Sequence, residues 1–225
     1  MPVITISREF ASGGSGIAEK VAQTLGCHLV DKDTIGRVLS QYGLPEFEEE
    51  YDAAPPNFWA RFDTQRMERR EVMVSLLNQT TLALARHGNV VMLGRCGFVV
   101  LKDYLNVLNV RLQAPLASRI KRVMERENLT DSDRAEAMVR EGDKVRASFV
   151  ETFYGARWDA ADAFDVVVDT DKVPADMAAT WLAEAARALA ARTASLAPIT
   201  RSIEPDAILA SAVSAELKCE ADHTK

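Results

Sequence analysis

The sequence predicts a doubly wound α/β fold built on a five-stranded parallel sheet. Five short runs of apolar, mostly β-branched residues begin near residues 3, 28, 90, 107 and 165, and helical patterns lie between them. No hairpin signal joins one run to the next, so consecutive strands are expected to be parallel and to be connected through helices. In an open sheet of this kind, ligands bind beyond the carboxyl ends of the strands.

The first strand is predicted at residues 3–6, and it leads through a polar, glycine-rich loop into a helix at residues 17–25. Glycines let several backbone N–H groups turn towards one point, and the N-terminus of the helix adds a partial positive charge. This order of strand, loop and helix is typical of a phosphate-binding P-loop; the alternative is a turn that merely connects the two elements. The residues expected to bind the phosphates of a nucleotide are Ser12, Gly13, Gly14, Ser15 and Gly16.

The loop departs from the usual pattern G-x-x-x-x-G-K-[ST], in which a lysine and a hydroxyl residue follow the last glycine. Gly14 stands at the lysine position and Gly16 at the hydroxyl position, with Ser15 between them. The positive charge must therefore come from another residue. Arg8 is the first candidate; Lys20, about one turn along the helix and expected to point away, is the second. Ser15 supplies the hydroxyl that we expect to bind Mg²⁺.

Composition excludes several classes of protein. Of the 225 residues, 48% are hydrophobic and 27% are charged, and no apolar run approaches the ~20 residues that span a bilayer. No basic segment or apolar signal region precedes the first strand, so we expect a cytoplasmic protein without a membrane partner. Cys27, Cys96 and Cys219 lack metal-ligand spacing and are expected to be free thiols. A net charge of −6 disfavours a general nucleic-acid-binding surface, although a local basic cluster can bind a small polyanion.

The second strand, at residues 27–30, is followed by Asp31, which therefore lies at the ligand-binding edge of the sheet. A helical pattern at residues 34–39 comes next. Residues 43–57 are rich in acidic residues and proline, which predicts an excursion from the core, and a long helix is predicted at residues 58–87.

The third run, at residues 90–93, is apolar throughout, which is typical of a strand buried on both faces of a parallel sheet. It ends at Gly94 and Arg95, so Arg95 is a candidate ligand at the edge of the sheet. The fourth strand is predicted at residues 106–112, before a helix that starts near Pro115. The fifth is predicted at residues 165–169, and an alanine-rich helix at residues 177–192 would cover the sheet.

The helical region after Pro115 carries many arginines and lysines. Several of them are expected to form exposed (i, i+4) ion pairs with neighbouring glutamates. Arg119 and Arg122 share one helical face at i, i+3, whereas a second basic group follows later in the chain. This second group is Arg140, Lys144 and Arg146.

From Pro198 onward we expect a partly disordered extension, with one more helix at residues 207–217 and a frayed end. The three histidines, His28, His87 and His223, are interpreted as strand, helix-end and tail residues rather than as catalytic groups.

Four stretches together resemble the cytidylate kinase-like branch of the P-loop nucleoside monophosphate kinases. They are ITISREFASGGSGIAEKVAQTLG at residues 4–26, HLVDKDTIGRVL at 28–39, VVMLGRCGFVVL at 90–101, and RLQAPLASRIKRVMERENLT at 111–130, which leads to VREGDKVRASF at 139–149. The resemblance covers roughly residues 3–170. It implies an ATP-dependent kinase that uses Mg²⁺, with a kinase-like domain at residues 1–197, an acceptor-binding insert at about 40–88, a lid at about 115–160 and an extension at 198–225.

The resemblance also implies roles for individual residues. Asp31 matches the aspartate at the end of the family's second strand and is a candidate for substrate binding. Arg37 matches the following arginine, which holds the acceptor monophosphate, and Arg95 matches an arginine that contacts the acceptor phosphate. Cys96 stands where the family has an aspartate that binds the sugar or base of the acceptor, which leaves the acceptor base open. The lid arginines of the family close over the transferring phosphoryl group, and the matching residues here are Arg119, Arg122, Arg140, Lys144 and Arg146.

Three functions stay open at this point. The first is a kinase that phosphorylates a pyrimidine nucleoside monophosphate such as CMP. The second is a kinase of another small molecule, which Cys96 and the insert favour. The third is a nucleotide-binding regulatory or scaffold protein without catalysis, which Gly14 at the lysine position favours and the many lid arginines oppose.

Overall fold

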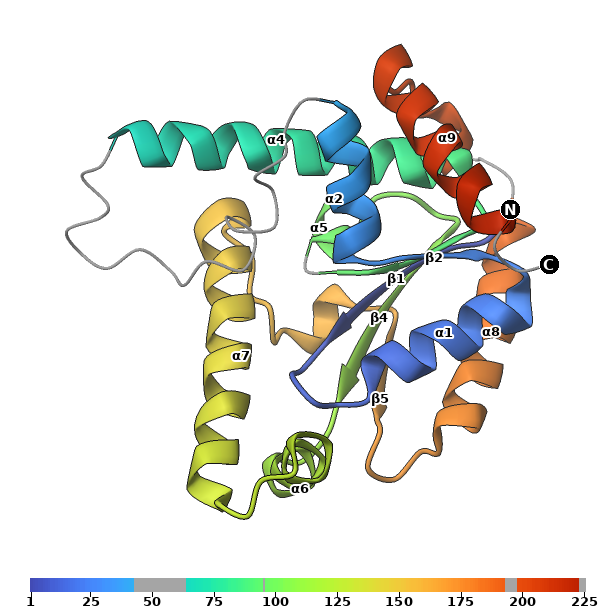
Figure 1. Ribbon diagram of the computed structural model, residues 1–225. Coiled ribbons are helices and arrows are strands. Elements are labelled where there is room, and N and C mark those ends of the chain that lie inside the picture. The colour runs from blue at the N-terminus through green and yellow to red at the C-terminus, as the bar shows by residue number, and fades with distance from the viewer. Residues whose placement is uncertain (43–63, 95, 193–197, 223–225) are drawn as a thin grey trace.

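The predicted parallel sheet is confirmed, and the order of its five strands is β2-β3-β1-β4-β5. The computed structural model describes residues 1–42, 64–94, 96–192 and 198–222, without the side chains of residues 64–67, 69 and 218–222. Within these residues, each pair of neighbouring strands is parallel, and the twisted sheet runs through the middle of the molecule (Figure 1). The strands are β1 (Val3–Arg8), β2 (His28–Val30), β3 (Val90–Leu93), β4 (Val107–Gln113) and β5 (Val166–Asp169).

Helices cover both faces of this sheet, as a doubly wound fold requires (Figure 1). One face is covered by α1 (Gly14–Leu25) and α8 (Ala175–Ala190), which pack against each other. The other face is covered by α2 (Lys32–Gln41), α4 (Thr64–His87), the short α5 (Gly97–Val100) and α9 (Ala207–Asp222). The described residues also contain two single 3₁₀ turns, η2 (Ala161–Ala163) and η3 (Thr200–Ser202).

Two more helices, α6 (Leu116–Glu127) and α7 (Ser132–Tyr154), pack against each other beyond the carboxyl end of β4. Figure 1 shows them beside the loop that joins β1 to α1. Val123, Ala135 and Val139 form a small core between them, and Phe10 of the β1–α1 loop packs against this core. Helices α6 and α7 and the β1–α1 loop are therefore parts of one packed unit.

Capping residues explain where several helices begin and end. Asp31 caps α2, because its Oδ1 accepts a hydrogen bond from the Thr34 N–H at 2.9 Å. Asp131 caps α7 in the same way, and α1 ends at Gly26, whose φ of 62° is left-handed. The helices predicted at residues 17–25, 34–39 and 177–192 are present and begin two or three residues earlier than predicted. Of the long helix predicted at 58–87, Thr64–His87 is helical; residues 58–63 and the predicted excursion at 43–57 lie outside the described residues.

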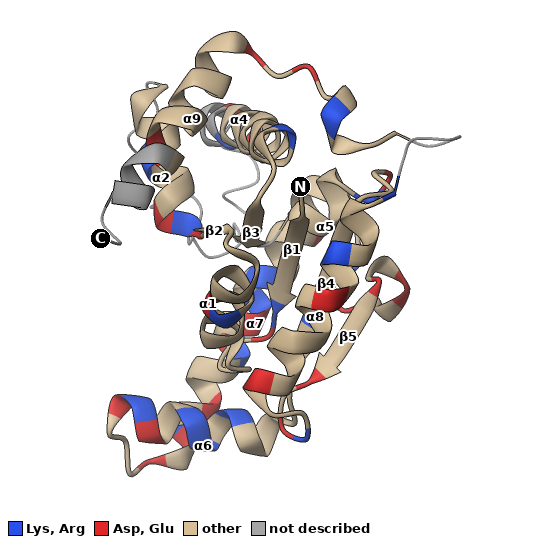
Figure 2. Ribbon diagram, turned by 90° about the vertical axis from the view of Figure 1, so that its right-hand side faces the viewer, with Lys and Arg blue, Asp and Glu red and all other residues tan. Residues whose placement is uncertain are grey.

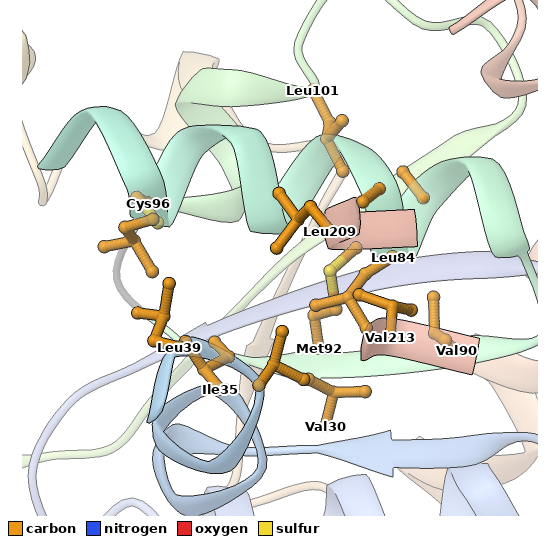
Figure 3. Close-up of a cluster of buried hydrophobic side chains, with 14 of the residues drawn as sticks. Val30, Ile35, Leu39, Leu84, Val90, Met92, Cys96, Leu101, Leu209 and Val213 are labelled. Carbon is orange, nitrogen blue, oxygen red and sulfur yellow. The ribbon is translucent and has the colours of Figure 1, made fainter. Parts of the chain in front are cut away.

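Helix α9 contributes to the main hydrophobic core rather than forming an appendix. Leu209, Val213 and Leu217 are at most 1% exposed and pack with residues of α2 and α4, as Figure 3 shows for Leu209 and Val213. Upstream, the Asn106 side chain makes two hydrogen bonds to Thr200, both of 2.8 Å. The helix predicted at residues 207–217 is thus present and longer than predicted, whereas the last residues, 223–225, lie outside the described part.

Replacing Leu209 with alanine is expected to lower the free energy of unfolding by about 2–5 kcal/mol, because the loss of side-chain carbons leaves a cavity in this core. The neighbouring Ile208 is 68% exposed, so Ile208→Ala should change the free energy of unfolding by less than about 0.5 kcal/mol. Urea denaturation of both variants measures the difference. Equal, small effects would show that α9 does not stabilise the fold.

The cysteines and histidines have structural surroundings. Cys27 and Cys96 are free thiols, and burial raises the pKa of the Cys27 thiol. His28 lies in β2 and contacts His87 at the end of α4, with ring centroids 6.1 Å apart. The side chains of Cys219 and His223 lie outside the described residues. Across the described chain, no helix combines the length and the apolar character needed to cross a membrane.

Candidate active site

The β1–α1 loop forms one wall of a pocket of about 210 Å³ at the carboxyl end of the sheet. The five predicted phosphate ligands, residues 12–16, all line this pocket. Three arginines from different elements line it as well: Arg8 at the end of β1, Arg126 on α6 and Arg146 on α7. Glycine-rich backbone and arginine side chains therefore face the same space.

The backbone of the loop is arranged to donate hydrogen bonds. Gly13 precedes α1 with a φ of 78°, and no side chain caps this helix. Within the described residues, the N–H groups of Gly14, Ser15 and Gly16 have no hydrogen-bond acceptor. Uncapped N–H groups at a helix N-terminus attract anions, so this end of α1 suits a phosphate.

Arg8 occupies the space that a side chain at position 14 would need. A Cβ atom on Gly14 would lie 2.8 Å from Cγ and 2.9 Å from Cβ of Arg8, closer than such atoms can approach. A side chain at position 14 would therefore clash with Arg8 in its present position. The glycine at the lysine position leaves room for this arginine. Arg8 also donates a hydrogen bond to the Gly94 carbonyl at 3.4 Å, beyond the end of β3. The aliphatic part of Arg8 thus packs on the loop where the P-loop lysine is missing, and the residue lines the pocket.

Lys20 lies elsewhere. On α1, Lys20 forms an ion pair with Asp176 of α8, and its side chain is 45% exposed. Lys20 does not line the pocket, which agrees with the expectation that it points away.

Glu9 brings a negative charge into the loop, and two buried arginines neutralise it. Its Oε1 accepts from Arg111 Nη2 at 3.4 Å, and its Oε2 lies 3.4 Å from Arg119 Nε and accepts from the Ala114 N–H at 3.0 Å. Burial lowers the pKa of Arg111, and the nearby Glu9 carboxylate opposes this effect. Arg111 also donates to the Trp158 carbonyl at 2.7 Å. The negative charge of Glu9 is therefore balanced by Arg111 and Arg119 without a bound phosphate.

Arg119 and Arg122 hold the loop from behind rather than lining the pocket. Arg119 is buried, donates to the Ala114 carbonyl at 3.0 Å and the Phe10 carbonyl at 3.3 Å, and pairs with Asp143 of α7. Arg122 donates to Thr170 twice, at 2.8 Å and 3.1 Å, and to the Ala11 carbonyl at 3.4 Å. Their guanidinium groups are engaged by protein acceptors. In this arrangement they contact the loop, and their closing over the phosphoryl group stays a prediction.

Phe10 joins the loop to α6 and α7 and contacts two pocket arginines. Its ring lies under the guanidinium carbons of Arg126 and Arg146, at 5.3 Å and 5.2 Å from the ring centroid. On α7, a Cβ atom at Gly142 would lie 2.6 Å from Cδ2 of Phe10, so the absent side chain allows the ring to pack on the helix. The Phe10 N–H donates to Asp143 at 2.8 Å. These contacts hold both arginines at the pocket.

The other two lid candidates are solvated. Arg140 pairs with Glu136 and Lys144 with Glu141, and their side chains are 64% and 65% exposed. Neither residue lines the pocket. Figure 2 shows how charges of both signs are distributed over the outer helices, α6 among them.

The acceptor candidates lie near the ends of β2 and β3. Asp31 caps α2 and also accepts from the Thr34 hydroxyl at 3.0 Å, and Arg37 of α2 donates to that hydroxyl at 3.2 Å. Arg95 lies outside the described residues. Cys96 is 4% exposed, faces the core cluster of Figure 3 and lies 4.0 Å from the Thr81 hydroxyl. The hollow of about 20 Å³ beside it is lined mostly by apolar side chains.

The residues present suit a Mg²⁺ ion that arrives with a nucleotide. Mg²⁺ usually keeps several waters and binds through one or two protein oxygens plus substrate phosphates. Ser15 is exposed in the first turn of α1 and lines the pocket, so its hydroxyl is placed for such a contact. Among the described residues, no group of three or more histidine, cysteine or acidic side chains forms a separate metal site.

Sequence reasoning missed several residues of this site. Arg126 was one of many arginines on a charged helix, and its spacing did not set it apart. Phe10 and Gly142 carry no motif, although a glycine inside a helix pattern is a signal for close packing. Arg111 lies in a strand, where a buried charge is rare without a partner.

Most of the chain is similar in sequence to known proteins. Residues 3–172 match the cytidylate kinase-like family. The cytidylate kinase of Ignicoccus hospitalis is 30% identical over 172 residues, which cover 76% of this chain and 90% of that protein. The cytidylate kinase of Methanosarcina acetivorans is 32% identical over 71 residues, which cover 32% of this chain and 39% of that protein.

Among solved structures, an uncharacterized protein from Eubacterium ventriosum superposes with a TM-score of 0.60 and 24% identity, over 81% of this chain and 98% of that chain. This similarity concerns the fold alone. The family match runs from β1 past the end of β5 and includes the β1–α1 loop and the helices α6 and α7. The chain belongs to the cytidylate kinase-like family.

Proposed function

We propose that this protein is an ATP-dependent kinase that transfers a phosphoryl group to a pyrimidine nucleoside monophosphate, with CMP as the first candidate. Family membership places it among the nucleotide kinases, and the curated relatives are cytidylate kinases. The observation that carries the proposal is the packing of Arg8 on Gly14. It gives the loop a cation where the usual lysine is missing, and so argues against a protein that has lost catalysis.

In this proposal the phosphates of ATP bind the backbone of residues 12–16, and Ser15 contacts the Mg²⁺ ion. Phosphoryl transfer needs in-line positioning and positive charge around the transferred group more than covalent help. Arg8, Arg126 and Arg146 supply this charge, because they line the pocket. Arg119 and Arg122 hold the loop in place. Arginine suits these positions, since it stays charged and binds phosphate through two N–H groups.

The acceptor binds in the proposal at the ends of β2 and β3, through Asp31, Arg37 and Arg95. Cys96 favours a second candidate, a kinase of another small molecule, because its buried thiol offers no charged group to an acceptor sugar or base. We also propose that the insert at about 40–88 binds the acceptor, that residues 115–160 act as the lid, and that the enzyme works in the cytoplasm on small nucleotides.

Turnover of the full-length chain with ATP and Mg²⁺ across a panel of nucleoside monophosphates tests this function. We expect CMP or another pyrimidine nucleotide to give the highest kcat/KM, by about tenfold or more over purine nucleotides. Arg8→Ala, prepared in the same way, controls for contaminating kinases. Activity confined to another small molecule would support the second candidate. ATP binding without any transfer would contradict the proposal.

A further inference from the structure

Helix α9 reaches the candidate acceptor site through a buried carboxylate. The Glu216 side chain is 9% exposed, and its Oε1 accepts a hydrogen bond from Nε of Arg37 on α2. Its Oε2 lies 3.5 Å from Nε2 of Gln41. The region that matches the family ends at residue 172, so it includes Arg37 and not Glu216.

The contact continues to the edge of the sheet. Arg37 Nη2 donates to the Thr34 hydroxyl at 3.2 Å, and this hydroxyl donates to Asp31 Oδ1 at 3.0 Å. Asp31 directly follows β2, at the carboxyl edge where ligands of such a sheet bind. One chain of hydrogen bonds thus connects α9 with both acceptor candidates on α2.

Anchoring α9 does not require this carboxylate. Leu209, Val213 and Leu217 already bury the helix in the core, and an apolar side chain at position 216 would add to that packing. Burying a carboxylate costs free energy unless a partner compensates it. We therefore attribute the role of Glu216 to its contact with Arg37 rather than to the packing of α9.

We propose that Glu216 is a positioning residue that holds the Arg37 guanidinium in place for the phosphate of the acceptor. This inference rests on the proposed function. A guanidinium has five N–H donors in one rigid plane, and the bond from Nε of Arg37 to Glu216 fixes the direction in which this plane faces. Because Arg37 is 50% exposed, its long side chain would otherwise lose much of its freedom on binding the acceptor.

The test is steady-state kinetics of the full chain with Glu216→Gln, which keeps the shape of the side chain and removes its charge. The acceptor KM is expected to rise about tenfold, whereas kcat and the ATP KM change less than about threefold. Glu216→Asp retains the charge and should restore part of the affinity. Val213→Ala, on the same helix but away from Arg37, is the matched control: it should lower the melting temperature and leave the acceptor KM unchanged.

An unchanged acceptor KM in Glu216→Gln, with an active wild type, would overturn this inference and leave the proposed function standing. A lower acceptor KM would also overturn it, because Glu216 would then compete with the phosphate for Arg37. A wild type that transfers phosphate to no nucleoside monophosphate would refute the proposed function itself, and this inference with it.

Discussion

Replacing Arg8 with alanine is expected to reduce phosphoryl transfer by about 10³-fold or more and to weaken ATP binding. ATP brings about four negative charges to the loop, and backbone dipoles with one Mg²⁺ ion leave part of this charge uncompensated. Arg8 lies against Gly14, where the lysine of a usual P-loop begins. Steady-state turnover and ATP binding isotherms measure the two effects.

Lys20→Ala is the matched control, because Lys20 pairs with the exposed Asp176 and lies away from the pocket. It should change turnover less than about twofold. The reverse order of effects would make Lys20 the phosphate ligand. If neither change matters and the enzyme still turns over, the charge comes from a lid arginine. Gly14→Lys should not improve the enzyme, since its Cβ would lie within 2.9 Å of two Arg8 carbon atoms.

The sequence predicted the sheet and the loop because both have local causes. A run such as residues 90–93 is buried throughout, and its apolar character alone predicts a central strand. The glycines at residues 13, 14 and 16 predict a turn because their backbones are conformationally free, and a helical pattern follows them directly. The prediction that Arg8 takes the place of the lysine also follows from chain order.

The lid could be predicted only in part, because the rotation of a helix depends on what it packs against. Arg119 and Arg122 do share one face of α6, as their spacing predicted. That face lies against the loop, because Val123 packs on α7 and fixes how α6 is turned. Nothing in the spacing distinguishes a face that lines a pocket from a face that supports its wall, and Arg126 was overlooked for the same reason.

The role of α9 needed tertiary contacts as well. Its sequence predicts an amphipathic helix but does not indicate which elements this helix packs against. Glu216 and Arg37 are separated by 179 residues, so their pairing follows from the way α9 packs against α2 and α4. Long-range pairs of this kind leave no local pattern.

Arg146→Ala is expected to lower turnover by about 10²–10³-fold while the protein stays folded. Arg146 lines the pocket from α7 and its guanidinium lies over the Phe10 ring, so we expect its charge to stabilise the transferring phosphoryl group. Turnover at saturating ATP, together with thermal melting, measures the effect. Arg140→Ala, on the same helix but 64% exposed and paired with Glu136, should change turnover little. A comparable loss of turnover in both variants would show that Arg140 also takes part in catalysis.

Arg119→Ala separates support of the loop from catalysis. Its side chain is 9% exposed, so its removal leaves Glu9 and Asp143 without their shared cation, which should cost about 3–5 kcal/mol of stability. Lost activity should then follow the lowered melting temperature, in contrast to Arg146→Ala. If Arg119→Ala instead melted like the wild type, bound ATP normally and lost turnover by about 10³-fold, Arg119 would leave Glu9 during the reaction and act on the phosphoryl group itself.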